Sequence, residues 1–417
     1  MSKGFRKFLL LWAGELISSI GGGLTSFGLG VYVFASTGSA SGMALVTLLG
    51  FLPTLILSVP AGVLADRFDR RLLMMIGDGC SGLGVLYILI CMMRGGASLS
   101  QICTGVFISA VFSSLLEPSY RATITDVLTK EEFSRAGGLV SLAGSARYLF
   151  SPVIAGLLLS VSDISLLLII DLCTFFVTIV ATAIVRRGIV SVKTAENKRF
   201  FESMKEGWKV VSGRKGMLPL IMVSSAITMF MGILQILVEP MVLSFSDSRT
   251  LGITETVCAS GMLVSGLFLG MKGIKKGYLN ILRLALLLAG IFMMGMSLFE
   301  NIYTICFFGF LFFAVLPVAN NCMDYLARTN IPDELQGRAW GFIGFLSQLG
   351  YVVAYAVSGV AADALGVLTK RGVGRGAAVM VMISGIFLAV TALTLSGIRG
   401  IRQLEAQEMR KASVTPS

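Results

Sequence analysis

The chain has 417 residues, of which 55% are hydrophobic and only 14% are charged, and its formal net charge is +11. Soluble domains carry about 25% charged residues, so the composition and the mean hydropathy of +0.86 exclude a soluble protein and place most of the chain in lipid. The positive charge would also fit a nucleic-acid-binding protein, but the positions of the basic residues indicate a membrane topology and no nucleic-acid partner.

Twelve apolar segments follow one another along the chain, each near the ~20 residues that span a bilayer as a helix. We expect these helices at residues 8–35, 42–64, 72–93, 98–122, 136–160, 164–186, 217–246, 251–271, 278–299, 302–326, 338–365 and 376–398. The first resembles a signal peptide, but Glu15 interrupts it and no small-residue cleavage site follows. The predicted fold is therefore an all-α integral membrane protein with an uncleaved first helix.

The basic residues predict the orientation of these helices. With a cytoplasmic N-terminus, 28 of the 34 basic residues fall in cytoplasmic segments, five fall outside, and Arg147 lies within the membrane. Such an excess of Lys and Arg is typical of cytoplasmic loops. We therefore expect a multi-pass protein of a bacterial-type inner (plasma) membrane with both termini in the cytoplasm.

The middle of the chain divides it into two halves. Residues 187–216 are rich in charge and place Phe200, Phe201, Met204 and Trp208 at helical spacing, which predicts an amphipathic helix on the inner membrane face. This linker joins an N-terminal bundle at 1–186 to a C-terminal bundle at 217–400, and a cytoplasmic tail follows at 401–417. Residues 129–133 and 331–335 are similar, which indicates two pseudo-symmetric six-helix bundles with a substrate site between them.

A charged turn at residues 62–71 separates the second and third helices. Asp66 and Arg70 are four residues apart and can pair if the second helix continues to them. An arginine fork in this turn can also hold a second carboxylate, such as Asp126. The simpler interpretation is a topology anchor, in which Arg67, Arg70 and Arg71 keep the turn in the cytoplasm.

Ionisable residues inside the predicted helices are the candidate substrate and proton sites. Each costs about 2.5–3.5 kcal/mol on insertion and usually faces a cavity or a partner. The seventh helix adds polar residues on one side, as a cavity lining would. The candidates are Glu15, Glu117, Arg147, Asp171, Thr228, Gln235 and Glu239. Internal ion pairs, such as Glu117 with Arg147, are the alternative, and because the chain has no histidine a proton relay must use carboxylates.

The pattern Gly62-x-Leu64-Ala65-Asp66-Arg67-x-x-Arg70-Arg71 resembles the signature loop of the major facilitator superfamily. Further segments are similar to the branch that includes macrolide efflux proteins: Leu11–Gly14, Gly50–Pro53, Tyr148–Pro152, Met204–Gly207 and Ile331–Arg338. The resemblance implies a loop that clamps the inner ends of the two bundles when the protein faces outward. The implied gating residues are Gly62, Asp66, Arg67, Arg70, Arg71 and Asp126.

The chain also departs from that family pattern. Asp69 stands where the signature loop usually has Gly, and the arginine common in the fourth helix of drug antiporters is missing, with Arg147 on the fifth helix instead. The Gly-Pro motif typical of antiporters is reduced to Ser151-Pro152. These departures weaken the case for proton antiport.

The function expected is secondary active efflux of lipophilic, cationic, macrolide-like compounds by proton-coupled alternating access. Glu15, and after it Glu239, would bind substrate when ionised and release it when protonated. The alternative keeps the fold and exports a native metabolite, a siderophore or a lipid-like cargo. No phosphate-binding Gly-Lys-Ser/Thr loop is present, so we expect no ATP-driven pump. No paired nucleophile and base and no metal-ligand cluster is present either, so we expect no enzyme and no cofactor. We also expect the protein to function as a monomer.

Overall fold

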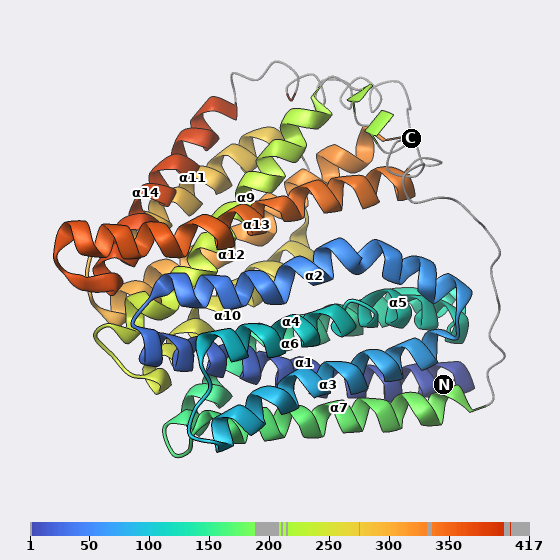
Figure 1. Ribbon diagram of the computed structural model, residues 1–417. Helices are drawn as coiled ribbons and strands as arrows, with labels where there is room; N and C mark the ends of the chain where they lie inside the picture. The colour runs from blue at the N-terminus through green and yellow to red at the C-terminus, as the bar shows by residue number, and fades with distance from the viewer. Residues whose placement is uncertain are drawn as a thin grey trace, which may run out of the picture. The chain divides into compact units, whose positions relative to one another are not determined.

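The computed structural model describes residues 2–187, 208–209, 212–213, 216–274, 276–331, 336–395 and 401. These residues form helices joined by short turns (Figure 1). The segment expected as an amphipathic linker lies almost wholly outside the described residues, and so does the tail after residue 401. Within the described part, 12 helical stretches are long and apolar enough to cross a membrane, which confirms the predicted fold class and the number of spans.

The described residues up to Arg187 form seven α-helices and one short 3₁₀ helix. They are α1 (Lys3–Thr37), α2 (Ala40–Arg67), α3 (Arg70–Met93), α4 (Leu99–Ser113), α5 (Leu116–Val127), η1 (Lys130–Glu132), α6 (Phe133–Leu159) and α7 (Ile164–Arg186). The second half contains α9 (Met217–Leu243), α10 (Ser248–Lys272), α11 (Tyr278–Ser297), α12 (Ile302–Thr329), α13 (Gln336–Thr369) and α14 (Gly372–Leu395).

The single helix expected over 98–122 is interrupted. α4 ends at Ser113 and α5 begins at Leu116, with the backbone N–H of Leu115 bonded to the carbonyl of Phe112 (3.1 Å) in a tighter turn. Pro118 explains the break, because a proline has no N–H for the carbonyl four residues earlier and its ring collides with that carbonyl. The prediction of one unbroken helix was wrong at this point, although both pieces belong to one membrane span.

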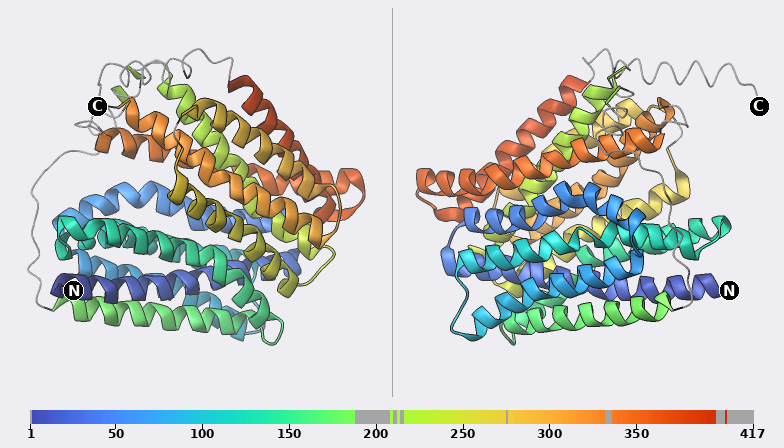
Figure 2. Two further views of the ribbon diagram at one scale, coloured as in Figure 1. Left: turned by 180° about the vertical axis from the view of Figure 1, so that it is seen from behind. Right: turned by 45° about the vertical axis from the view of Figure 1, so that its right-hand side comes forward.

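The helices pack into two units. Unit 1 contains α1 to α7 together with the first part of α10 as far as Thr256, and unit 2 contains α9, the rest of α10 and α11 to α14. In unit 1, α7 packs against both α1 and α3, and Figure 2 shows the dark-blue α1 alongside the green α7 from two further directions. In unit 2, α11 packs against α12 and α14.

Small residues allow this close packing. Lipid chains are as apolar as leucine, so helices in a membrane associate by contact between complementary surfaces. A Cβ placed at Gly290 on α11 would lie 2.6 Å from the carbonyl oxygen of Gly385 on α14. In unit 1 a Cβ at Gly84 of α3 would collide with the carbonyl oxygen of Gly105 on α4. Both helix pairs therefore depend on glycine at their contact points.

Candidate functional site

The turn between α2 and α3 is built from the charged residues that the sequence singled out. α2 ends at Arg67, and the Asp69 carboxylate caps α3 by accepting from the backbone N–H of Arg71 (3.1 Å). Asp66 and Arg70 therefore pair across a helix break, with 3.7 Å between Oδ1 and Nη2. Asp69 also accepts from Arg186 Nε on α7 (2.8 Å), so the turn is tied to two helices.

Two arginines of this turn converge on Asp126 of α5. Arg70 Nη1 lies 2.5 Å from one carboxylate oxygen and Arg71 Nη2 lies 2.8 Å from the other. Arg70 also donates to the backbone carbonyls of Ala65 and Ala122, each at 3.2 Å. The side chain of Arg71 is only 1% exposed and that of Asp126 14%. We refer to Arg70, Arg71 and Asp126 as the arginine–aspartate cluster; it joins the start of α3 to α5.

The other three expected gating residues lie on the surface of unit 1. The Asp66 side chain is 61% exposed, Arg67 is exposed, and a Cβ at Gly62 would meet nothing within 4 Å. Unit 1 therefore buries the cluster and leaves Asp66 accessible, as a residue that binds a second element would be.

Glu15 and Arg147 come from neighbouring helices of unit 1, α1 and α6. Glu15 is half-buried and lies within electrostatic reach of both Glu117 and Arg147. Arg147 is exposed, and its Nη2 donates to the hydroxyl of Ser26 (3.0 Å). The alternative in which Glu117 and Arg147 neutralise each other was wrong, because Glu117 instead pairs with Arg121 one turn along α5 (2.7 Å) on the exposed surface.

Asp171 lies in the interior of unit 1, 1% exposed. Its carboxylate accepts from the hydroxyl of Thr25 on α1 (2.7 Å) and more weakly from Thr174 (3.4 Å). A Cβ at Gly21 would lie 2.8 Å from Asp171 Oδ1 and would collide with Thr174 Oγ1. Glycine at position 21 therefore lets α1 approach the polar face of α7.

The polar stripe of α9 packs within unit 2. Thr228 Oγ1 donates to the carbonyl of Ser347 on α13, and the Ser347 hydroxyl donates to Ser224 (2.8 Å). Gln235 accepts from the hydroxyl of Tyr355 (2.5 Å), and Glu239 is half-buried further along the same helix. The stripe that the sequence assigned to a cavity lining thus also joins α9 to α13.

Asp78 and Tyr120 are among the polar residues of unit 1 that were not singled out in the sequence. Asp78, on α3, is 3% exposed and lies beside Thr178 of α7. Tyr120, on α5, is 5% exposed, and its hydroxyl has no hydrogen-bond partner among the described residues. The signal for Asp78 was available, since a carboxylate inside an apolar span is rare and is usually functional.

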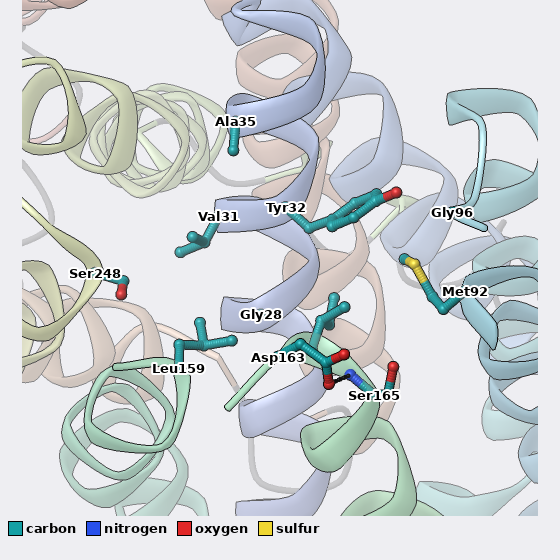
Figure 3. A pocket seen from close by; sticks show the side chains of 11 residues that line it. Gly28, Val31, Tyr32, Ala35, Met92, Gly96, Leu159, Asp163, Ser165 and Ser248 are labelled. Carbon is teal, nitrogen blue, oxygen red and sulfur yellow. Dashed lines mark hydrogen bonds between the residues drawn. The ribbon is translucent and has the colours of Figure 1, made fainter. Parts of the chain in front are cut away.

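A hollow of about 330 Å³ opens at the end of α1 and α7 that lies away from the arginine–aspartate cluster (Figure 3). Tyr32, Met92 and Asp163 line it, and the Asp163 carboxylate is occupied by the backbone N–H of Ser165 (3.1 Å). It contains none of the residues that the sequence proposed for substrate. Among the described residues, no group of three or more acidic or cysteine side chains is arranged to hold a metal ion.

Comparison with known proteins agrees with this architecture. The chain is 26% identical over 410 residues to macrolide efflux protein A of Streptococcus pyogenes, covering 96% of this chain and 97% of that protein. It is 22% identical over 377 residues to multidrug efflux pump Tap of Mycolicibacterium fortuitum, covering 86% and 90%. A bacterial homologue of the human lysosomal transporter Spinster has a similar fold, with a TM-score of 0.74 at 14% identity, covering 97% and 99%.

These proteins are transporters, in agreement with the expectation that the chain is not an enzyme. The charged turn, the twelve spans and the relatives all indicate one family, and the family model of the Major Facilitator Superfamily matches residues 11–355. The chain therefore belongs to the major facilitator superfamily.

Proposed function

We propose that the chain exports lipophilic, cationic, macrolide-like compounds from the cytoplasm by proton-coupled alternating access. The observation that carries this proposal is Glu15, a half-buried carboxylate in a membrane-spanning helix with Arg147 within electrostatic reach. Such a group is costly in a membrane unless it serves a pathway. The likeness to macrolide and multidrug efflux proteins supports the cargo class.

In this mechanism Glu15 alternates between two partners. Ionised, it attracts the positive charge of the cargo; protonated, it no longer does, and the cargo is released. Arg147 stabilises the ionised form while the cargo is absent. Glu239 is the second candidate for the same role, and Glu117, whose charge is satisfied by Arg121, tunes the field around Glu15.

The turn between α2 and α3 acts as the gate. The arginine–aspartate cluster makes the turn rigid, and the exposed Asp66 binds the opposite half of the transporter when the cytoplasmic side closes. The proposal also includes the topology and the functional unit. Both termini lie in the cytoplasm, the protein lies in the plasma membrane, and one monomer is sufficient for transport.

The test is efflux from energised cells that lack their major pumps, with macrolides, lipophilic cations and neutral dyes compared with and without a protonophore. We expect export of the cationic set, its loss with protonophore, and its loss in Glu15→Gln. Glu300→Gln is the matched control, because Glu300 is exposed between α11 and α12. Export of neutral or acidic compounds that survives Glu15→Gln and Glu239→Gln would favour a native metabolite, a siderophore or a lipid-like cargo instead.

A further inference from the structure

Three carboxylates share the interior of unit 1. Asp78 of α3 and Asp171 of α7 are 3% and 1% exposed, and Glu15 of α1 is half-buried. Asp78 lies within electrostatic reach of both Glu15 and Asp171. Because α7 packs against both α1 and α3, the three side chains from three helices form one group, which we call the interior acidic group.

Hydroxyl groups of α7 lie beside the two aspartates of this group. Thr174 and Thr178 follow Asp171 on the same face of α7; Thr174 contacts Asp171 and Thr178 contacts Asp78. The Thr178 hydroxyl also lies 3.1 Å from the carbonyl of Thr174. A Cβ at Gly14, next to Glu15, would lie 3.2 Å from Cγ2 of Thr178, so α1 packs closely on α7 one residue away from Glu15.

The charges of the group do not balance. Arg147 is a cation within reach of Glu15 and Asp171. Glu117, which pairs with Arg121, adds a further negative charge near Glu15, and α4, which also packs on α3, has no charged residue along Leu99–Ser113. Three ionised carboxylates beside one guanidinium would leave excess negative charge in a region of low dielectric constant, where an unpaired charge costs several kcal/mol. Binding of protons by the group would remove this excess charge.

Tyr120 provides an independent observation. Its hydroxyl is buried, has no hydrogen-bond partner among the described residues, and interacts electrostatically with Glu15. A buried hydroxyl without a partner costs about 1–3 kcal/mol. A hydrogen bond from the Tyr120 hydroxyl to Glu15, formed in one protonation state of the group, would remove this penalty.

From these observations we infer that Asp78 shares the transported proton with Glu15, in a proton-binding site that lies wholly within unit 1 between α1, α3 and α7. The proton leaves the carboxyl of Asp78, which becomes a carboxylate, and binds the carboxylate of Glu15, which becomes a carboxylic acid. This inference rests on the proton coupling proposed above. It assigns the coupling to two residues, one of them on a helix where the sequence suggested none.

Infrared spectroscopy of the purified protein tests the site without any cargo. Exposed carboxyls are ionised above about pH 5, so a protonated-carboxyl band between about pH 5 and pH 9 reports interior groups. We expect Asp78→Asn to remove part of this band, and Asp163→Asn, at the exposed cap of α7, to leave it unchanged. An Asp78→Asn band equal to that of the unmodified protein would overturn the inference.

A second arm separates a proton role from a structural one. Thr178→Val removes a hydroxyl that lies beside Asp78 and donates to backbone carbonyls of α7, but it keeps the carboxyl of Asp78; we expect it to retain uphill efflux within threefold. Asp78→Asn should lose uphill efflux at least tenfold while cargo exchange without a gradient continues, and Asp78→Glu should restore it in part. Equal losses in Thr178→Val and Asp78→Asn, for exchange as well as for uphill efflux, would show a purely structural role and would refute the inference.

The two arms fail independently of each other. If Asp78→Asn does not fold, unmodified protein with isotope-labelled aspartate still answers the question: absence of a protonated aspartate band above pH 5 overturns the inference. If the band is present and depends on Asp78 but no compound is exported, the proposed cargo is wrong and the proton site stands. Proton-driven export with an unchanged band in Asp78→Asn leaves the proposed function intact and removes Asp78 from it.

Discussion

Replacing Asp126 with Asn should destabilise unit 1 through the charge of Arg71. Asn keeps the volume of Asp and can still accept a hydrogen bond, but it removes the negative charge that Arg70 and Arg71 share. Arg71 is 1% exposed, and its other acidic neighbour, Asp69, is 4.0 Å away and is already bound to Arg186 at 2.8 Å. The substitution therefore leaves a buried guanidinium with weak compensation.

The expected loss is about 3 kcal/mol, the lower end of the cost of leaving a buried charge without its partner, because Asp69 still offers part of a counter-charge. For a unit of this size, that corresponds to a decrease in Tm of roughly 6–12 °C. Glu117→Gln breaks a pair whose side chains are 72% and 70% exposed; exposed pairs contribute about 0.2–1 kcal/mol, so its Tm should fall by less than about 4 °C.

The assay is thermal unfolding of the purified variants in one detergent at one scan rate. The double variant Arg71→Met with Asp126→Leu provides the internal check, because replacing both partners of a buried pair by apolar residues is often close to neutral. We expect it to melt at a higher temperature than Asp126→Asn. A decrease for Asp126→Asn no larger than that for Glu117→Gln would refute the reasoning, and so would a double variant that melts lower than the single one.

Three further predictions follow from the same structure. Asp66→Asn should reduce transport turnover at least tenfold while membrane insertion and cargo binding persist, since Asp66 is exposed on unit 1; unchanged efflux would remove it from the gate. Gly21→Val should lower Tm by several degrees, because its side chain would overlap Thr174; a Tm equal to that of Gly22→Val, where a Cβ meets nothing within 4 Å, would contradict this. The hydrogen bond from Thr250 lowers the pKa of Asp247 below its ordinary value of 3.8. The ionised Asp247 carboxylate therefore stabilises the folded protein above pH 3.8, and this stabilisation disappears as the pH falls through the lowered pKa. In Asp247→Asn this part of the pH dependence of Tm should vanish, and a profile identical to that of the unmodified protein would count against the cap.

The membrane spans could be predicted from the sequence because a chain in lipid has few allowed backbone structures. Each polar backbone group in the bilayer must be satisfied within its own helix, so apolar length alone locates the helices and the glycine and serine turns between them. The pairing of Arg70 with Asp126 was also accessible, since the charges were few and a guanidinium fork seeks a carboxylate.

The arrangement of side chains from different helices could not be predicted in the same way. Asp78 lies near Glu15 only because α3 and α1 both pack on α7, and the spacing of residues along one helix carries no information about that contact. The partner of Glu117 is different: Arg121 lies four residues later and was visible as a local pair. The alternative pairing of Glu117 with Arg147 overlooked that a neighbour on the same helix needs no tertiary contact.

Proton-driven export of a cationic cargo through Glu15 can be measured in proteoliposomes. A pH gradient is imposed, and the movement of a lipophilic cation and the internal pH are recorded together. We expect uphill movement of the cation coincident with a proton flux in the opposite direction, with both lost in Glu15→Gln and both retained in Glu300→Gln. Cation movement without a proton flux, or coupled transport that persists in Glu15→Gln, would show that Glu15 does not couple export to protons.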